Sequence, residues 1–261
     1  MLEIIKSKDN TIIKDIKKLQ EKKYRNIYNR FIVEGFRFVS EALESNFNVI
    51  YVIISESIEE KFEKIGLNQK IKGSTKIIKV SESILKSICS TDNPQGIAAV
   101  VSNREINVDY DEGFYILADR VQDPGNMGTI IRTANAAGAK GIIVTKGSVD
   151  IYNSKTLRST MGSIFKIPII IDEDLVHIKE FKEQGFKIVV SSLDTKNNFY
   201  DIDLTGKIII AVGNEGSGIS EEIYGISDVR VKIPMPGNTE SLNVGIAAGI
   251  MMFEAVRQKN S

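Results

Sequence analysis

The second half of the chain alternates short apolar runs with segments of helical character, and this alternation constrains the fold more than any other feature of the sequence. The runs are FYILAD from Phe114, GIIVT from Gly141, KIPIII from Lys166, KIVVSSL from Lys187, KIIIAVG from Lys207 and VRVKIPM from Val229. Most are continuously apolar, which is typical of strands covered on both faces. We therefore predict an α/β fold with a mainly parallel sheet flanked by helices.

The first hundred residues predict a second, smaller α/β domain, with helices near residues 11–23 and at Phe36–Glu44 between short strands. A polar, acidic stretch, NREINVDYDEG, follows without a helical period and is typical of a linker. We predict domains at residues 1–103 and 113–261 joined by a linker at 104–112. A chain of 261 residues with 42% hydrophobic residues is long enough to bury a core in each domain.

Composition excludes several kinds of site. Cys89 is the only cysteine and His177 the only histidine, so a disulfide framework, a zinc site and a Cys-His nucleophile pair are not expected, and we predict no metal. No apolar run approaches the roughly 18 residues that cross a bilayer, and the first residues lack the apolar centre of a signal peptide. We expect a cytoplasmic protein without a membrane partner.

The N-terminal segment is basic although the formal net charge of the chain is zero. The first 30 residues hold nine Lys or Arg against four Asp or Glu, and a helix with Ile13, Ile16 and Leu19 on its apolar stripe would carry cations on its other face. Such a face could follow a nucleic-acid backbone, or it could be an ordinary solvated face. The candidate cations for such a backbone contact are Lys14, Lys18, Lys22 and Arg25.

Ligands in parallel α/β sheets gather at the carboxyl ends of strands, and the first loop of interest there is ADRVQDPGNMGTIIRTANAAGA. Asn126 can begin a helix after the Asp-Pro-Gly turn. Arg132 then lies about two turns into that helix. By spacing alone, Arg132 could serve a ligand or be an ion-paired surface residue.

The second loop, IIIAVGNEGSGIS, places Gly213, Gly216 and Gly218 directly after an apolar run. Glycine there permits close backbone approach to a ligand, although a simple turn into a helix near Ser220 would look the same. The spacing fits neither familiar phosphate loop, and Glu215 would repel a phosphate. A nucleoside or a cation suits this loop better than a pyrophosphate.

The third loop lies in VKIPMPGNTESLNVGIAAGIMMFEAV, where Ser241, Asn243 and other polar residues precede an apolar helix. Capping uses only one or two such groups, so the surplus indicates a bound ligand. The helix is apolar almost all round, which predicts burial in a core or a subunit contact. Gly245 and Gly249 would let a neighbour approach it closely.

Together, these three loops resemble, in order, the motifs of the SpoU/TrmH-type RNA 2'-O-ribose methyltransferases of the SPOUT superfamily. Upstream, NRFIVEGFRFVSEAL and TDNPQGIAAVV resemble the substrate-binding domain of the ribosomal RNA branch. The resemblance implies a sheet whose C-terminal part forms a deep trefoil knot, S-adenosylmethionine as methyl donor, an RNA substrate and a homodimer.

Motif positions carry the family's donor contacts onto Gly213, Ile233 and Leu242, with Asn214 and Met235 nearby. The resemblance implies that backbone groups hold the donor, which would account for the glycines of the second loop. It also implies that Arg158 and Ser159, in YNSKTLRSTMGSIF, contact RNA near the site.

The family's catalytic cluster maps onto Asn126, Arg132, Glu215, Ser241 and Asn243. The resemblance implies that Arg132 holds the phosphate beside the target ribose, that Asn126 and Asn243 orient nucleotide or donor, and that Glu215 and Ser241 fix those side chains. Arginine as the general base conflicts with the permanent protonation of guanidinium groups, so a phosphate oxygen or water is the expected proton acceptor.

The function implied is S-adenosylmethionine-dependent 2'-O-methylation of RNA, most simply of a guanosine or uridine ribose in ribosomal RNA. Transfer RNA is an alternative substrate, and a non-catalytic RNA-binding relative is an alternative function. Presence of all five cluster residues argues against the latter. An ordinary nucleotide-binding enzyme is disfavoured because the phosphate-loop fingerprints are absent.

Overall fold

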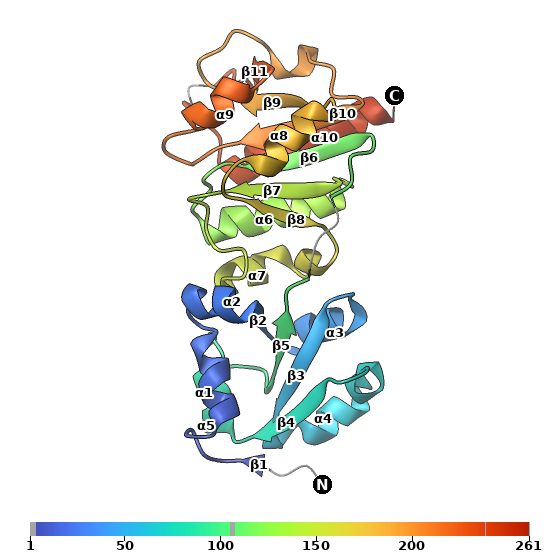
Figure 1. Cartoon of the computed structure of the whole chain (residues 1–261), viewed down its shortest axis with the longest axis vertical. Coiled ribbons are helices and arrows are strands. Elements are labelled where there is room, and N and C mark those ends of the chain that lie inside the picture. Colours follow the sequence, from blue (N-terminus) through green and yellow to red (C-terminus); the bar gives the residue numbers. More distant parts are fainter. Residues whose placement is uncertain (1–3, 105–107, 238, 261) are drawn as a thin grey trace. The chain divides into compact units, whose positions relative to one another are not determined.

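The computed structural model divides into two compact units, each with its own sheet (Figure 1). The first comprises Met1–Glu105 with Tyr152–Phe165, and the second comprises Ile106–Ile151 with Lys166–Ser261. The segment Tyr152–Phe165, which the sequence assigned to the second domain, therefore groups with the first unit. The structure describes residues 4–104, 108–237 and 239–260.

The first unit is built on a five-stranded sheet in the order β1-β4-β3-β5-β2, in which β5 runs antiparallel to both neighbours. Its strands are β1 (Ile4–Ile5), β2 (Arg30–Glu34), β3 (Asn48–Ser55), β4 (Lys76–Val80) and β5 (Ile97–Ser102). Its α-helices are α1 (Thr11–Lys18), α2 (Lys22–Tyr28), α3 (Phe36–Glu44), α4 (Glu59–Lys64), α5 (Glu82–Ile88) and α7 (Ser154–Thr160). Short 3₁₀ turns lie at Glu56–Ile58, Leu67–Lys70 and Ser163–Phe165.

Helices α1 and α5 cover one face of this sheet and share a buried cluster with it. The predicted stripe of Ile13, Ile16 and Leu19 is confirmed, since all three side chains are at most 4% exposed. The single helix expected over residues 11–23 is wrong, because the chain breaks after α1 and restarts as α2 at Lys22. The Arg25 guanidinium donates to the carbonyls of the residues at that break, which stabilises the turn.

The second unit contains a six-stranded sheet in the order β11-β9-β10-β6-β7-β8, and every pairing in it is parallel. The predicted parallel α/β fold is confirmed. The strands are β6 (Gly113–Ala118), β7 (Gly141–Thr145), β8 (Ile169–Asp172), β9 (Lys187–Ser191), β10 (Lys207–Val212) and β11 (Val229–Val231). The α-helices are α6 (Pro124–Ala136), α8 (Val176–Glu183), α9 (Glu221–Ile226) and α10 (Val244–Lys259), with a 3₁₀ turn at Phe199–Asp201.

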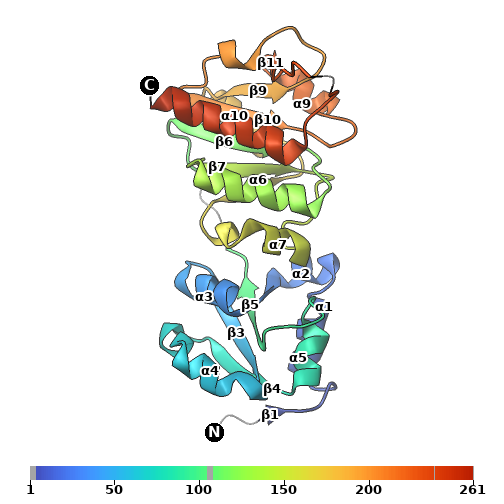
Figure 2. The same ribbon diagram turned by 180° about the vertical axis from the view of Figure 1, so that it is seen from behind.

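Helices α6 and α10 lie side by side on one face of this sheet, and α8 and α9 lie on the other (Figures 1 and 2). A Cβ added at Gly245 of α10 would lie 3.2 Å from Thr129 of α6, and one at Gly249 would lie 3.7 Å from Thr133. The predicted close approach is confirmed at Gly245, whereas a Cβ at Gly249 would make only an ordinary van der Waals contact. Within the described residues, none of the helices combines the length and apolarity that a bilayer span needs.

The register of the sheet brings the predicted loops together. Ala118, the last residue of β6, pairs with Val212, the last residue of β10, so the loops after these strands start side by side. Strand β9 adjoins β10 on the other side. The carboxyl ends of β9, β10 and β6 therefore form one continuous edge.

The C-terminal end of α10 is fixed by a buried carboxylate. Glu254 is 8% exposed and accepts two hydrogen bonds from Arg257, at 2.9 and 2.7 Å, and one from Gln258 at 2.9 Å. Gln258 also bonds the main chain of Ile202 and Leu204. Hydrogen bonds from Arg257, then from Gln258, lower the pKa of Glu254 to about 2.

Because its pKa falls from 4.5 to about 2 on folding, Glu254 contributes stability that is present above pH 4.5 and lost as the pH falls toward 2. We expect Glu254→Gln to lower the free energy of unfolding at pH 7. The difference from the parent should shrink between pH 4.5 and pH 2, as measured by urea titration at a series of pH values. Glu183→Gln, at an exposed glutamate of α8, is the control. A difference of equal size at pH 7 and pH 3 would contradict this account.

Candidate active site

A buried carboxylate at the end of β6 fixes the second loop. Asp119 is 1% exposed; its Oδ1 accepts from Thr145 Oγ1 at 2.8 Å, and its Oδ2 accepts from the Ser220 amide at 2.6 Å. Ser220 is the N-cap of α9, as the sequence indicated, so Asp119 holds the far end of the glycine loop against β6. Asp119 was not identified from the sequence, although a carboxylate directly after an apolar run was a usable signal.

Glu215 ties the glycine loop to the first loop. Its Oε1 accepts from Asn126 Nδ2 at 2.9 Å and from the Asp123 amide at 3.3 Å, and its Oε2 accepts from the Gln122 amide at 3.3 Å. Burial raises the pKa of Glu215, but the hydrogen bonds from Asn126 and the main chain outweigh burial and leave it lowered. Glu215 is therefore an ionised acceptor and a weak base at neutral pH.

Asn126 and Asn243 join the first loop to the third. Asn243 Nδ2 donates to Asn126 Oδ1 at 2.8 Å, while Asn243 Oδ1 caps α10 by accepting from the amides of Gly245 and Ile246. The expectation that Asn126 begins α6 is wrong, because Asp123 is the N-cap and accepts from the Asn126 amide. The Asn126 side chain is thus free to link Glu215 and Asn243 into one polar network.

The other two candidates of the predicted cluster lie outside this network. Arg132 is an exposed residue of α6, six positions after Asn126. Ser241 is exposed on the loop before α10. Neither side chain has a hydrogen bond or ion pair with any other described residue, so the structure does not show Ser241 fixing Asn126 or Arg132.

A cavity of about 370 Å³ opens at the carboxyl ends of β9 and β10. All five residues predicted to bind the donor line it, together with Glu215 and Ser241. The five are Gly213, Asn214, Ile233, Met235 and Leu242. Four further lining residues were not identified from the sequence: Ser191, the last residue of β9, Ser192 and Leu193, which follow it, and Tyr224 of α9. The polar pair after an apolar run was the available signal, but only the sheet order shows that β9 adjoins β10.

The glycine loop folds back on its own backbone. Asn214 and Gly218 exchange two main-chain hydrogen bonds, at 2.9 and 3.0 Å, and Gly218 has a φ of +68°. A Cβ on Gly213 would lie 2.3 Å from the carbonyl carbon of Gly218. The packing of this loop therefore requires glycine at position 213, apart from any contact with a ligand.

We expect Gly213→Ala to destabilise the second unit by about 1–3 kcal/mol, because the added methyl group overlaps backbone that cannot move independently. Thermal unfolding would measure the loss. Gly216→Ala is the matched control, since the nearest atom to its Cβ would be Asn214 Oδ1 at 3.6 Å. Equal melting temperatures for the two variants would contradict this interpretation.

The basic residues predicted to contact RNA have different environments in the first unit. Lys14 pairs with Asp9 and Lys18 with Asp15, each at 2.9 Å, and Lys22 is exposed at the start of α2.

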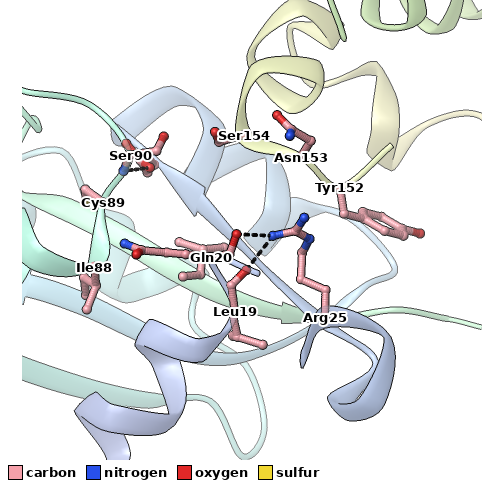
Figure 3. A pocket seen from close by; sticks show the side chains of 11 residues that line it. Leu19, Gln20, Arg25, Ile88, Cys89, Ser90, Tyr152, Asn153 and Ser154 are labelled. Atoms are coloured by element: carbon pink, nitrogen blue, oxygen red, sulfur yellow. Dashed lines mark hydrogen bonds between the residues drawn. The ribbon is translucent and has the colours of Figure 1, made fainter. Parts of the chain in front are cut away.

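Arg25 departs from the expected exposed face, because it is only 8% exposed. Its Nη1 donates to the carbonyls of Leu19 and Gln20, both at 2.8 Å, beside a cavity of about 300 Å³ (Figure 3). The expectation of an exposed cation was wrong because Arg25 stabilises the break between α1 and α2.

Arg158 belongs to α7 of the first unit, although its motif had placed it in the catalytic domain. Its Nη1 donates to Ser90 Oγ at 2.8 Å. The guanidinium is otherwise exposed.

Comparison with known proteins gives matches along nearly the whole chain. Residues 113–253 match the SpoU rRNA Methylase family, and residues 10–99 match the MRM3-like substrate binding domain. The chain is 34% identical over 249 residues to 23S rRNA (guanosine(2553)-2'-O)-methyltransferase RlmP of Bacillus subtilis (strain 168), covering 95% of this chain and 97% of that protein. It is 31% identical over 242 residues to 23S rRNA (uridine(2479)-2'-O)-methyltransferase of Streptomyces viridochromogenes, covering 88% and 84%. Its structure resembles that of an AdoMet-bound rRNA methyltransferase from Sinorhizobium meliloti, with a TM-score of 0.86, 32% identity and 98% of each chain covered.

Proposed function

The chain belongs to the SpoU rRNA methylase family, and on that premise we propose that it transfers the methyl group of S-adenosylmethionine to a ribose 2'-hydroxyl of ribosomal RNA. The observation that carries the proposal is that the cavity and the polar network have a residue in common. Glu215 lines the cavity and accepts from Asn126, which in turn accepts from Asn243. The names of the relatives support a guanosine or a uridine as acceptor, and ribosomal over transfer RNA.

The cavity suits S-adenosylmethionine in size and chemistry. Its volume falls within the range of about 300–1,000 Å³ typical of small-molecule sites. Apolar side chains of Ile233, Met235 and Leu242 would contact the adenosine, while main-chain groups around Gly213 and Asn214 would accept and donate hydrogen bonds. When bound, the donor supplies an activated methyl group.

The protein's task is then to position the ribose and let its proton leave. Arg132, exposed and without an internal partner among the described residues, is suited to hold the phosphate beside the target ribose. It stays protonated, so a phosphate oxygen or water takes the proton. Asn126 and Asn243 orient the reacting nucleotide, and Glu215 fixes Asn126. Ser241 forms part of the rim of the cavity.

We expect the parent protein to bind S-adenosylhomocysteine in calorimetry and to transfer labelled methyl groups to unmodified ribosomal RNA at positions that then resist alkaline cleavage. Arg132→Ala should lower the rate by at least about 100-fold, because the ribose loses its orientation, while donor affinity stays unchanged. Lys179→Ala, on α8, is the charge-loss control. Equal rates for Arg132→Ala and parent would rule out the role of Arg132. A parent protein that neither binds S-adenosylhomocysteine nor transfers methyl groups would contradict the proposed function.

We also propose that the segment after β11 completes a trefoil knot. Strand β11 lies at one edge of the sheet, yet α10 packs on α6 and β10 near the middle. The chain between β11 and α10 therefore passes the carboxyl ends of β9 and β10, where Ile233, Met235, Glu240, Ser241 and Leu242 line the cavity. This crossing supports the knot that the family resemblance implies.

A homodimer is supported by the outer face of α10. Ile246 and Phe253 are 55% and 51% exposed, and Ile250 lies between them on the same face. A second copy of the chain would remove this apolar stripe from water.

We expect the parent to sediment as a dimer at micromolar concentration. Phe253→Glu should shift it to monomer, because a buried unpaired carboxylate is costly at an interface. Val176→Glu, at a residue of α8 that is 52% exposed, is the control. A monomeric parent would count against the dimer.

The first unit is proposed to select the RNA. The match of residues 10–99 to a substrate binding domain supports this role. Lys14, Lys18 and Lys22 would contact the RNA backbone from α1 and α2. We keep residues 1–103 and 113–261 as the proposed domains with a linker at 104–112, and we propose a cytoplasmic location, where ribosomal RNA is found.

A further inference from the structure

Arg120, directly after β6, has a left-handed backbone with a φ of +54°. Its amide donates to Thr145 Oγ1 at 3.1 Å and its carbonyl accepts from Asn214 Nδ2 at 3.0 Å, so the surrounding loops impose this conformation. Glycine or asparagine would adopt it with little strain, whereas arginine carries a Cβ penalty. A strained residue beside a candidate active site suggests that its side chain has a function.

The guanidinium of Arg120 donates no hydrogen bond to any other described residue. Its stem lies over Gly147, where a Cβ would be 3.4 Å from Arg120 Cγ. Nε is buried without a hydrogen-bond partner among the described residues. The Asp119 carboxylate is 3.9 Å away, and its Oδ2 already accepts from Ser220. With 38% of the side chain exposed, the cation is available to a ligand.

A second cation lies on the neighbouring loop. Strand β7 pairs with β6 in parallel, and Lys146 follows β7 directly as an exposed residue with no ion pair in the described part of the chain. The two loops are held together by a hydrogen bond from the Val149 amide to the Val121 carbonyl at 2.8 Å. The donor cavity, the polar network and these two cations therefore follow one another along the carboxyl edge of β9, β10, β6 and β7.

We propose that Arg120, assisted by Lys146, binds RNA phosphate on the side of the polar network opposite the donor cavity. This inference rests on the proposed RNA methyltransferase function and adds a contact for the backbone that flanks the target ribose. A guanidinium matches phosphate bidentately, and phosphate contacts set the register of a nucleic acid. The competing explanation is that Arg120 serves only as counterion to Asp119.

Arg120→Asn separates the two explanations, because asparagine tolerates the left-handed backbone while the charge is lost. Filter binding of a labelled, unmodified 23S ribosomal RNA transcript, with S-adenosylhomocysteine present, should show roughly fivefold weaker affinity for the variant. The slope of log affinity against log salt should fall by about 1. Arg120→Lys should retain most of the affinity, Lys146→Asn should lose affinity in the same direction, and Lys179→Asn should match the parent.

If Arg120 serves only as counterion to Asp119, Arg120→Asn would change stability and donor affinity instead of RNA affinity. Loss of the counterion would loosen Ser220 and the glycine loop, so melting temperature and S-adenosylhomocysteine affinity would fall together. Unchanged RNA affinity and salt slope in Arg120→Asn, or losses limited to stability and donor affinity, would overturn the proposal. A parent that neither binds nor methylates the transcript would instead overturn the proposed function, and this inference with it.

Discussion

Glu215 accepts hydrogen bonds from the Asn126 side chain and from two amides of the loop after β6, and the candidate site depends on these contacts. They join segments about ninety residues apart in sequence. Through Asn126 they extend to Asn243, which also begins α10. Displacement of Glu215 would therefore replace these bonds by bonds to water, at a net cost of about 0.5–1.5 kcal/mol for each.

The same hydrogen bonds decide what Glu215 can do chemically. They favour the ionised carboxylate, so its pKa is lowered despite burial, and it accepts protons poorly at neutral pH. Arg132 is a permanent cation. Under the proposed function, the site would work by positioning an activated donor and a ribose hydroxyl, with the proton passing to the substrate phosphate or to water. The arrangement of cations and amides matters more than the strength of any base.

Local sequence patterns predicted helices correctly where apolar residues recur at helical spacing. Helix α3 spans Phe36–Glu44 as expected, and the apolar stripe of α1 is buried. Prediction failed where a side chain bonds a distant or unexpected backbone group. Arg25 turns inward because two carbonyls between α1 and α2 need a donor, and α6 starts earlier than Asn126 because Asp123 caps it. Residue type alone does not reveal either bond.

Some residues of the candidate site were also predictable from local sequence, and others were not. The glycine loop, the polar loop before α10 and the five predicted donor-binding residues of the cavity were identified from motifs. Asp119, Ser192 and Tyr224 were missed, because their relation to the site depends on which strands are neighbours. Gly213 was identified, but its structural reason was not. The structure shows that its own loop approaches too closely for a Cβ.

By itself, the sequence determined the parallel α/β fold, since continuously apolar runs can be stable only with both faces covered. It also determined that polar and glycine-rich loops follow those runs. Only the tertiary structure decided that β10 lies between β9 and β6, and that Asn126, Glu215 and Asn243 therefore meet. The physical reason is that strand order and hydrogen bonds between distant loops depend on the packing of the whole sheet, which no local pattern of residues encodes.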